Sequence, residues 1–147
     1  MTRRRRRAPL RGRVVAAGSG AALGALAWFG APVLLGRVAV FQPHLFSRTA
    51  LHGDALGRAL AAADVVVVAP IYAAREQPLP GVTADIVARG AARAGAATVA
   101  VRDRAALTDH VAERVKPGDV VFTLGAGDIT RVGPELLERL ARPGRAA

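Results

Sequence analysis

The chain has 147 residues, of which 52% are hydrophobic, so it is long and apolar enough for one domain with its own core. It contains no cysteine, which excludes a disulfide framework, thiolate catalysis and thiolate metal sites. The formal net charge is +10, but residues 1–37 hold eight arginines and no acidic residue, and they carry +8 of it. Because the rest of the chain is nearly balanced, we expect no nucleic-acid partner for it.

The first 36 residues divide into a basic arm, residues 1–13, and an uncharged segment, residues 14–36. The composition of the arm predicts disorder. At about 1.5 Å per residue, residues 14–35 are just long enough to cross a hydrocarbon core of roughly 30 Å, and arginines precede them as in a membrane anchor. The Ala- and Gly-rich composition and Pro32 weaken that interpretation. A membrane anchor, a helix packed on the following domain and a segment without a folded role all remain open.

From residue 37 to residue 142 the pattern predicts one domain of alternating strands and helices. The apolar, β-branched runs that we interpret as buried strands are residues 38–41, 65–69, 98–101 and 120–124. The helical patterns span residues 49–63, 83–94 and 105–115, and a last helix holds Leu136, Leu137 and Leu140. Such alternation predicts an α/β fold with a mainly parallel sheet and right-handed crossovers.

In a sheet of this kind, the loops at the carboxyl ends of the strands line the ligand site. The first such loop, residues 42–48, places His44 and Arg48 four residues apart at the entrance to a helix. A guanidinium group suits a carboxylate, and an imidazole suits ligand orientation or proton transfer. The competing interpretation makes His44 a capping or packing residue and Arg48 a surface charge.

The second loop carries Tyr72, Arg75 and Glu76, followed by prolines that stiffen it. These side chains either line a polar site or face water. The third loop, Arg102 and Asp103, has no motif, and we expect it to be plain surface.

The fourth loop contains Gly125, Gly127 and Asp128 and precedes a helix, as phosphate-binding turns do. It is not a dinucleotide fingerprint, because Thr130 stands where the third glycine belongs. A tight turn in which Asp128 caps the helix is the competing interpretation.

Several motifs follow one another in order along the chain: the segment FQPH with an arginine four residues beyond His44, PLPGV at residues 78–82, PGDVV at 117–121, and GAGDI at 125–129 followed by GPELL. Over residues 38–140 they resemble the C-terminal domain of the Mur ligases, and most of all the family that joins L-alanine to UDP-N-acetylmuramate in peptidoglycan synthesis. Leu45 departs from members that place a second arginine after the histidine.

The resemblance implies a Rossmann-like three-layer domain that binds the incoming L-alanine and closes the nucleotide cleft of a larger enzyme. It further implies that His44 and Arg48 contact the amino acid, with Arg48 on its carboxylate and Tyr72 and Glu76 nearby. Gly125, Gly127 and Asp128 would then lie at the site of ATP, which the complete family enzyme uses with magnesium.

The sequence also departs from a complete ligase. Its only lysine is Lys116, and it has no G-x-x-x-x-G-K-[ST] loop. We therefore expect a truncated ligase domain without catalytic or metal-binding residues of its own, without tight ATP or magnesium binding, and inactive alone unless the other ligase domains are supplied in trans. The expected location is the cytoplasm. The alternative is a non-catalytic α/β module that residues 14–35 tether to the inner membrane face, where it binds cell-wall enzymes.

Overall fold

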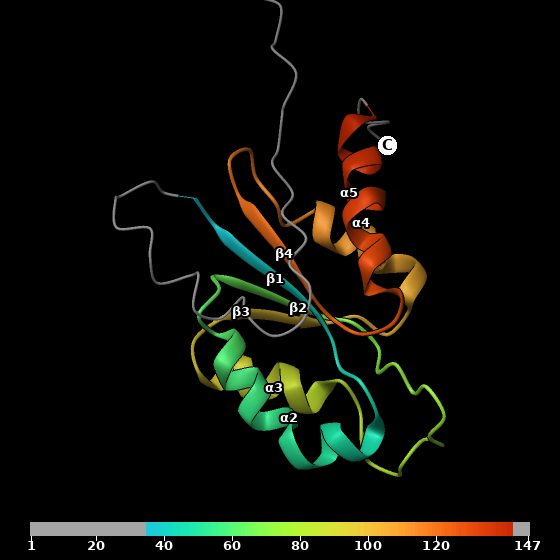
Figure 1. Cartoon of the computed structure of the whole chain (residues 1–147). Helices are drawn as coiled ribbons and strands as arrows, with labels where there is room; N and C mark the ends of the chain where they lie inside the picture. The colour runs from blue at the N-terminus through green and yellow to red at the C-terminus, as the bar shows by residue number, and fades with distance from the viewer. Residues whose placement is uncertain (1–34, 143–147) are drawn as a thin grey trace, which may run out of the picture.

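The computed structural model describes residues 35–142, which contain one four-stranded parallel sheet (Figure 1). The strands are β1 (Arg37–Gln42), β2 (Val65–Val68), β3 (Ala97–Ala100) and β4 (Val120–Gly125), in the order β3-β2-β1-β4. All neighbouring pairs are parallel. The α/β prediction is confirmed, and each predicted strand lies within one residue of its observed bounds.

Helices cover both faces of the sheet, so the predicted three-layer arrangement is confirmed (Figure 1). One face carries α2 (Phe46–Leu60) and α3 (Asp85–Arg93), and the other carries α4 (Leu107–Ala112) and α5 (Val132–Ala141). Short 3₁₀ turns, η1 (Arg104–Ala106) and η2 (Asp128–Arg131), precede α4 and α5. The helix predicted at residues 49–63 begins and ends three residues earlier, and the one predicted at 105–115 ends at Ala112.

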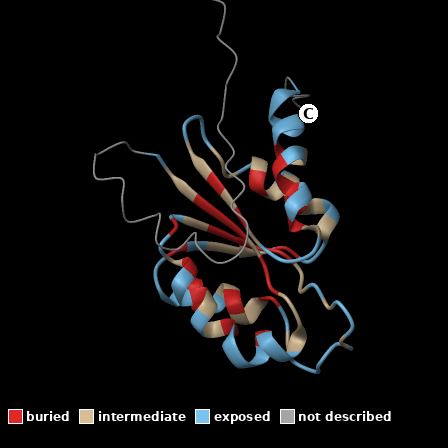
Figure 2. Cartoon of the chain, viewed as in Figure 1, coloured by how far each residue is buried: buried red, intermediate tan, exposed pale blue. Residues whose placement is uncertain are grey.

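Alternate residues of each strand supply two separate cores. Val38 and Val40 of β1 pack toward α4 and α5, whereas Ala39 packs toward α2 and α3. Figure 2 shows the buried residues concentrated in the strands and on the helix faces that meet them. Since both faces of the sheet are covered, its strands are continuous apolar runs.

The α2–α3 contact is unusually close because two glycines lie in it. A methyl group on Gly57 would stand 2.1 Å from the carbonyl oxygen of Val87, and one on Gly90 would stand 2.5 Å from that of Asp54. The Asp54 carboxylate also pairs with Arg58 and Arg93, which ties the two helices together at the surface. No larger residue fits at either glycine without moving a helix.

The strand order creates a topological switch point between β1 and β4. The two strands pair along their length, with Gln42 opposite Gly125 at their carboxyl ends. The chain leaves β1 toward α2 on one face of the sheet and leaves β4 toward α5 on the other. Open α/β sheets bind their ligands at such a point, so the fold brings the first and fourth predicted loops together there.

No helix within residues 35–142 is both long and apolar enough to span a bilayer. The basic arm and residues 14–34 of the apolar segment lie outside the described residues, so the anchor hypothesis remains a prediction.

Candidate functional site

The loops that follow β1 and β2 are joined through their backbones. The N–H of Leu45 donates to the carbonyl of Tyr72 at 3.0 Å, and the N–H of Tyr72 donates to the carbonyl of Pro43 at 2.8 Å. These bonds extend the strand pairing beyond the sheet, with His44 opposite Tyr72. The two rings stack, with centroids 5.9 Å apart and planes inclined by 18°. His44 therefore does pack, and it packs against another predicted site residue.

Glu76 binds the amino end of α2. Its carboxylate accepts the N–H of Ser47 at 2.9 Å and also the Ser47 hydroxyl. The Ser47 hydroxyl and, after it, the Ser47 N–H hold the pKa of Glu76 below its usual range. A carboxylate at this position is also favoured by the helix dipole. The structure thus places Glu76 where it holds the first turn of the helix that carries Arg48.

The residue before α2 is conformationally strained. Leu45 has a φ of +69°, a region that residues other than glycine seldom occupy. Its carbonyl accepts both the N–H of Thr49, at 3.1 Å, and the hydroxyl of the buried Thr49 side chain, at 2.8 Å. These bonds hold the sharp entry of the chain into α2, directly after His44.

Arg48 lies in the exposed first turn of α2. It forms no ion pair with any residue that the structure describes. Within the described part of the chain, its guanidinium group is therefore available to the carboxylate of a ligand.

The loop after β4 reaches the same place from the other side. A methyl group on Gly125 would stand 2.5 Å from the carbonyl oxygen of Gln42, and one on Gly127 would stand 2.6 Å from the Tyr72 ring. Both glycines have a positive φ, +135° and +94°. Tyr72 is 40% exposed, and its ring lies close to both Gly127 and His44, so three predicted loops meet there.

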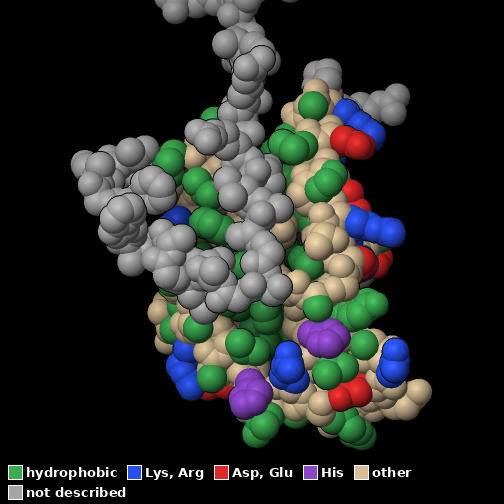
Figure 3. All heavy atoms as spheres, in the orientation of Figure 1, with side chains coloured by type: hydrophobic (Ala, Val, Ile, Leu, Met, Phe, Trp, Pro, Cys, Tyr) green, Lys and Arg blue, Asp and Glu red, His purple; other side chains and the backbone are tan. Residues whose placement is uncertain are grey.

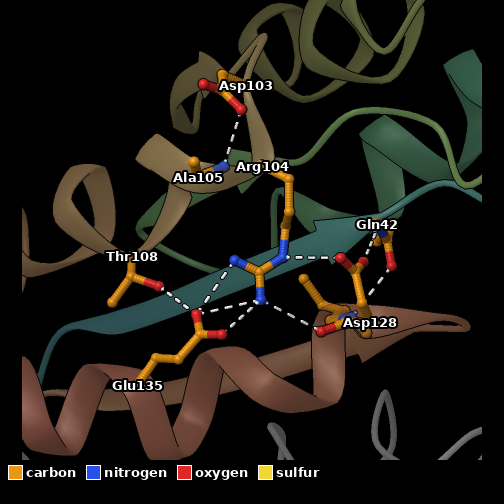
Figure 4. A network of polar contacts seen from close by, with 8 residues as sticks. Gln42, Asp103, Arg104, Ala105, Thr108, Asp128 and Glu135 are labelled. Carbon is orange, nitrogen blue, oxygen red and sulfur yellow. Dashed lines mark hydrogen bonds and ion pairs between the residues drawn. The ribbon is translucent and has the colours of Figure 1, made fainter.

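Asp128 does not cap the following helix, so the capping part of the competing interpretation is wrong, whereas the positive φ angles of Gly125 and Gly127 agree with its tight turn. Gly127 is the residue before η2, and no side-chain cap is formed there. Instead the Asp128 carboxylate accepts a hydrogen bond from the Gln42 amide at 2.7 Å and lies 3.2 Å from Nε of Arg104 (Figure 4). The carbonyl oxygen of the Gln42 side chain in turn accepts the N–H of Ile129 at 3.2 Å.

Arg104 connects this loop to α5. Its Nη1 and Nη2 donate to the Glu135 carboxylate at 3.1 Å, and Thr108 donates to the same carboxylate at 2.7 Å (Figure 4). The exposed side chains of Arg102 and Asp103 agree with the surface prediction for the third loop. The next residue, Arg104, has a side chain only 24% exposed, and we did not single it out from the sequence. Gln42 was missed as well, although a polar residue that closes an apolar strand is a usable signal.

The described residues fit a nucleotide and magnesium poorly. They include no cluster of His, Cys, Asp or Glu that could hold a metal ion. The Asp128 carboxylate is occupied by Gln42 and Arg104, and the space above Gly127 is filled by Tyr72. The glycines therefore have a structural explanation that needs no phosphate.

In the space-filling view, the histidines lie over the lower part of the molecule, where α2 and the loop after β2 lie, and both basic and acidic side chains lie near them (Figure 3).

Comparison with known proteins identifies the family. The family model described as "Mur ligase, glutamate ligase domain" matches residues 14–127, and so begins earlier than the resemblance expected near residue 38. The chain is 50% identical over 103 residues to a UDP-N-acetylmuramate–L-alanine ligase of Streptomyces avermitilis. This alignment covers 70% of this chain and 22% of that protein. It is 54% identical over 104 residues to one of a Nocardioides species, covering 69% and 23%.

The fold has a counterpart among solved structures. A murein peptide ligase from Psychrobacter arcticus superposes with a TM-score of 0.56 at 15% identity, over 76% of this chain and 23% of that one. The chain thus spans roughly a fifth of the length of the relatives that it matches. On the strength of the family match and of these relatives, the chain belongs to the Mur ligase, glutamate ligase domain family.

Proposed function

We propose that residues 37–142 form the amino-acid-binding, cleft-closing domain of an ATP-dependent UDP-N-acetylmuramate:L-alanine ligase, an enzyme of peptidoglycan precursor synthesis. The observation that carries this proposal is the stacking of His44 on Tyr72 just before α2, whose first turn carries Arg48, a residue without an ion pair to any residue that the structure describes. The relatives with about half of their aligned residues identical bear the name of that ligase, which supports L-alanine as the ligand.

The chemistry of the site suits a small amino acid. Arg48 offers two parallel donors to the ligand carboxylate, and the amino end of α2 adds a favourable potential for the same anion. His44 and Tyr72 offer a short ring surface to a methyl side chain. Glu76 contributes by holding the first turn of α2 through Ser47, and with it Arg48.

Titration of the 147-residue protein with L-alanine, followed by NMR, tests the site. L-alanine should shift the ring signals of His44 and Tyr72, whereas L-alaninamide, which lacks the carboxylate, should not. Arg48→Met should weaken L-alanine binding about tenfold or more, as expected for loss of a hydrogen bond to a charged group. Arg89→Met is the matched control, because Arg89 is an exposed arginine of α3 without an ion pair to any described residue. Equal affinity of the Arg48→Met variant and the parent would overturn the assignment.

We also propose that the 147-residue chain does not catalyse ligation alone. It has no P-loop lysine, and without that lysine and its magnesium ligands phosphoryl transfer loses its electrostatic clamp. Purified protein mixed with ATP, UDP-N-acetylmuramate and L-alanine should release no phosphate above a blank. Release that begins only when the remaining domains of a relative are added would support action in trans, whereas release by the protein alone would refute the proposal.

Two finer points belong to the same proposal. The residues Gly125, Gly127 and Asp128 would approach the nucleotide only in the complete enzyme. ATP with magnesium, added at the concentration of L-alanine that saturates the amino-acid site, should therefore leave the NMR signal of the Ala126 amide unshifted.

The location of the protein would be cytoplasmic. Fractionation of the full chain and of a chain without residues 1–36 checks this, because membrane association confined to the full chain would favour the anchor.

A further inference from the structure

We propose that Gln42 and Arg104 are positioning residues for the amino-acid site. Together they hold the loop of residues 125–128 (the glycine loop), which supports Tyr72 against His44. Where the ligand is concerned, this inference rests on the proposed function. Its structural part, the control of Tyr72 by the glycine loop, is independent of that function.

Gln42 holds the glycine loop through both ends of its side-chain amide. The amide nitrogen donates to Asp128 at 2.7 Å and the amide oxygen accepts from the N–H of Ile129 at 3.2 Å. Gln42 is 4% exposed, and both groups of its side-chain amide would be left without partners if the loop moved away. Because a buried polar group without a partner is costly, the amide and the loop hold each other in one arrangement.

Arg104 fixes the other side of Asp128. Its guanidinium group stands between two carboxylates, with Nε 3.2 Å from Asp128 and Nη2 3.1 Å from Glu135. Without this cation, the two carboxylates would face each other with no shared counter-charge, and each would be driven to turn toward water. A rotation of Asp128 would break its bond to Gln42. Arg104 therefore acts on the loop through Asp128.

The position of the glycine loop affects the ligand site through the contact between Gly127 and Tyr72. The Tyr72 ring lies so close to the Gly127 backbone that a methyl group there would stand 2.6 Å from ring carbon Cδ2. The same ring stacks on His44. A displacement of the loop would therefore remove the support of Tyr72 and change its angle to His44, although Arg48 would stay in place on α2.

The experiment compares Arg104→Met with Arg139→Met in the full chain. Arg139 is the matched control, because it too forms an ion pair that involves α5, here with Asp109 of α4 at 2.7 Å, and it forms no hydrogen bond or ion pair with the glycine loop. Hydrogen exchange of the Ile129 amide reports the Gln42 bond directly, and that of Val121, buried in β4, reports global stability. Arg104→Met should speed exchange at Ile129 about tenfold relative to Val121 and shift the ring signals of Tyr72 and His44. Arg139→Met should do neither.

L-alanine affinity separates a positioning role from a merely structural one. Arg104→Met should weaken L-alanine binding about tenfold, while Arg139→Met should leave it unchanged. Arg104→Lys keeps the charge and should recover part of the lost affinity. The Lys variant also replaces the Met variant in the comparison if the Met variant does not fold. Faster exchange at Ile129 with unchanged affinity would overturn the positioning role. If the parent protein does not bind L-alanine, the proposed function fails, and the exchange and ring signals still decide whether Arg104 controls the loop.

Discussion

Replacing Gly57 by alanine would place a methyl group inside the contact between α2 and α3. The added carbon would stand 2.1 Å from the Val87 carbonyl oxygen and 2.8 Å from the Ala91 nitrogen, whereas ordinary contact begins at 3.4 Å. These are backbone atoms, so the helices must separate as units. Overpacking destabilises a fold by about 3 kcal/mol at the upper end of its usual range. Replacing glycine by alanine inside a helix stabilises it by about 1 kcal/mol through helix propensity. We expect a net loss of about 2 kcal/mol in the free energy of unfolding.

Gly53→Ala is the matched control in the same helix. Gly53 is also buried, but its nearest obstacle is the Cγ2 methyl of Ile86 at 2.9 Å, which belongs to a side chain that can rotate away. The propensity gain of about 1 kcal/mol is the same, so Gly53→Ala should be neutral or slightly stabilising. Urea unfolding followed by circular dichroism measures both variants. If their unfolding free energies agree within about 0.5 kcal/mol, the argument from helix contact is refuted.

Two further predictions concern the loops. The pKa of Glu76 is lowered in the folded state by Ser47, so the interaction stabilises the fold above the unfolded pKa of about 4.3 and is lost as the pH falls through the folded value. Glu76→Gln should therefore lower the urea midpoint more at pH 7 than at pH 3, and an equal change at both pH values would contradict this. Gly127→Ala forces a side chain into φ +94°, ψ −142° and against the Tyr72 ring, at a backbone cost of about 1–3 kcal/mol. It should shift the His44 ring signals in NMR, and unchanged signals would count against the stacked arrangement.

The strands and most of the helices follow from local sequence. Runs such as Val65–Val68 need no partner to be recognised, because β-branched side chains and burial on both faces leave a continuous apolar signature. The positions of the loops follow too, since they lie between those runs. Local pattern is a weaker guide for the helices: Leu51 has helical spacing with Leu56 and Leu60 but is 76% exposed and so lies on the solvent side of α2.

The candidate site was predictable only in part. His44, Arg48, Tyr72 and Glu76 could be named from residue type and position, but not the stacking of the rings or the bond from Glu76 to α2. Those depend on the order of the strands in the sheet. The sequence shows that the strands are parallel, whereas their order β3-β2-β1-β4, and thus the switch point, results from which faces bury which side chains.

The network around Asp128 illustrates the same division. The glycines beside Asp128 predict a tight turn from the sequence alone, because glycine is the residue that most readily adopts the positive φ angles of such turns. The partners of its carboxylate lie 86 residues away at Gln42 and 24 residues away at Arg104, on other strands and loops. Periodicity and propensity act over a few neighbouring residues, so they identify elements and turns. Pairing between distant side chains is decided by the packing of the whole sheet, which only the tertiary structure contains.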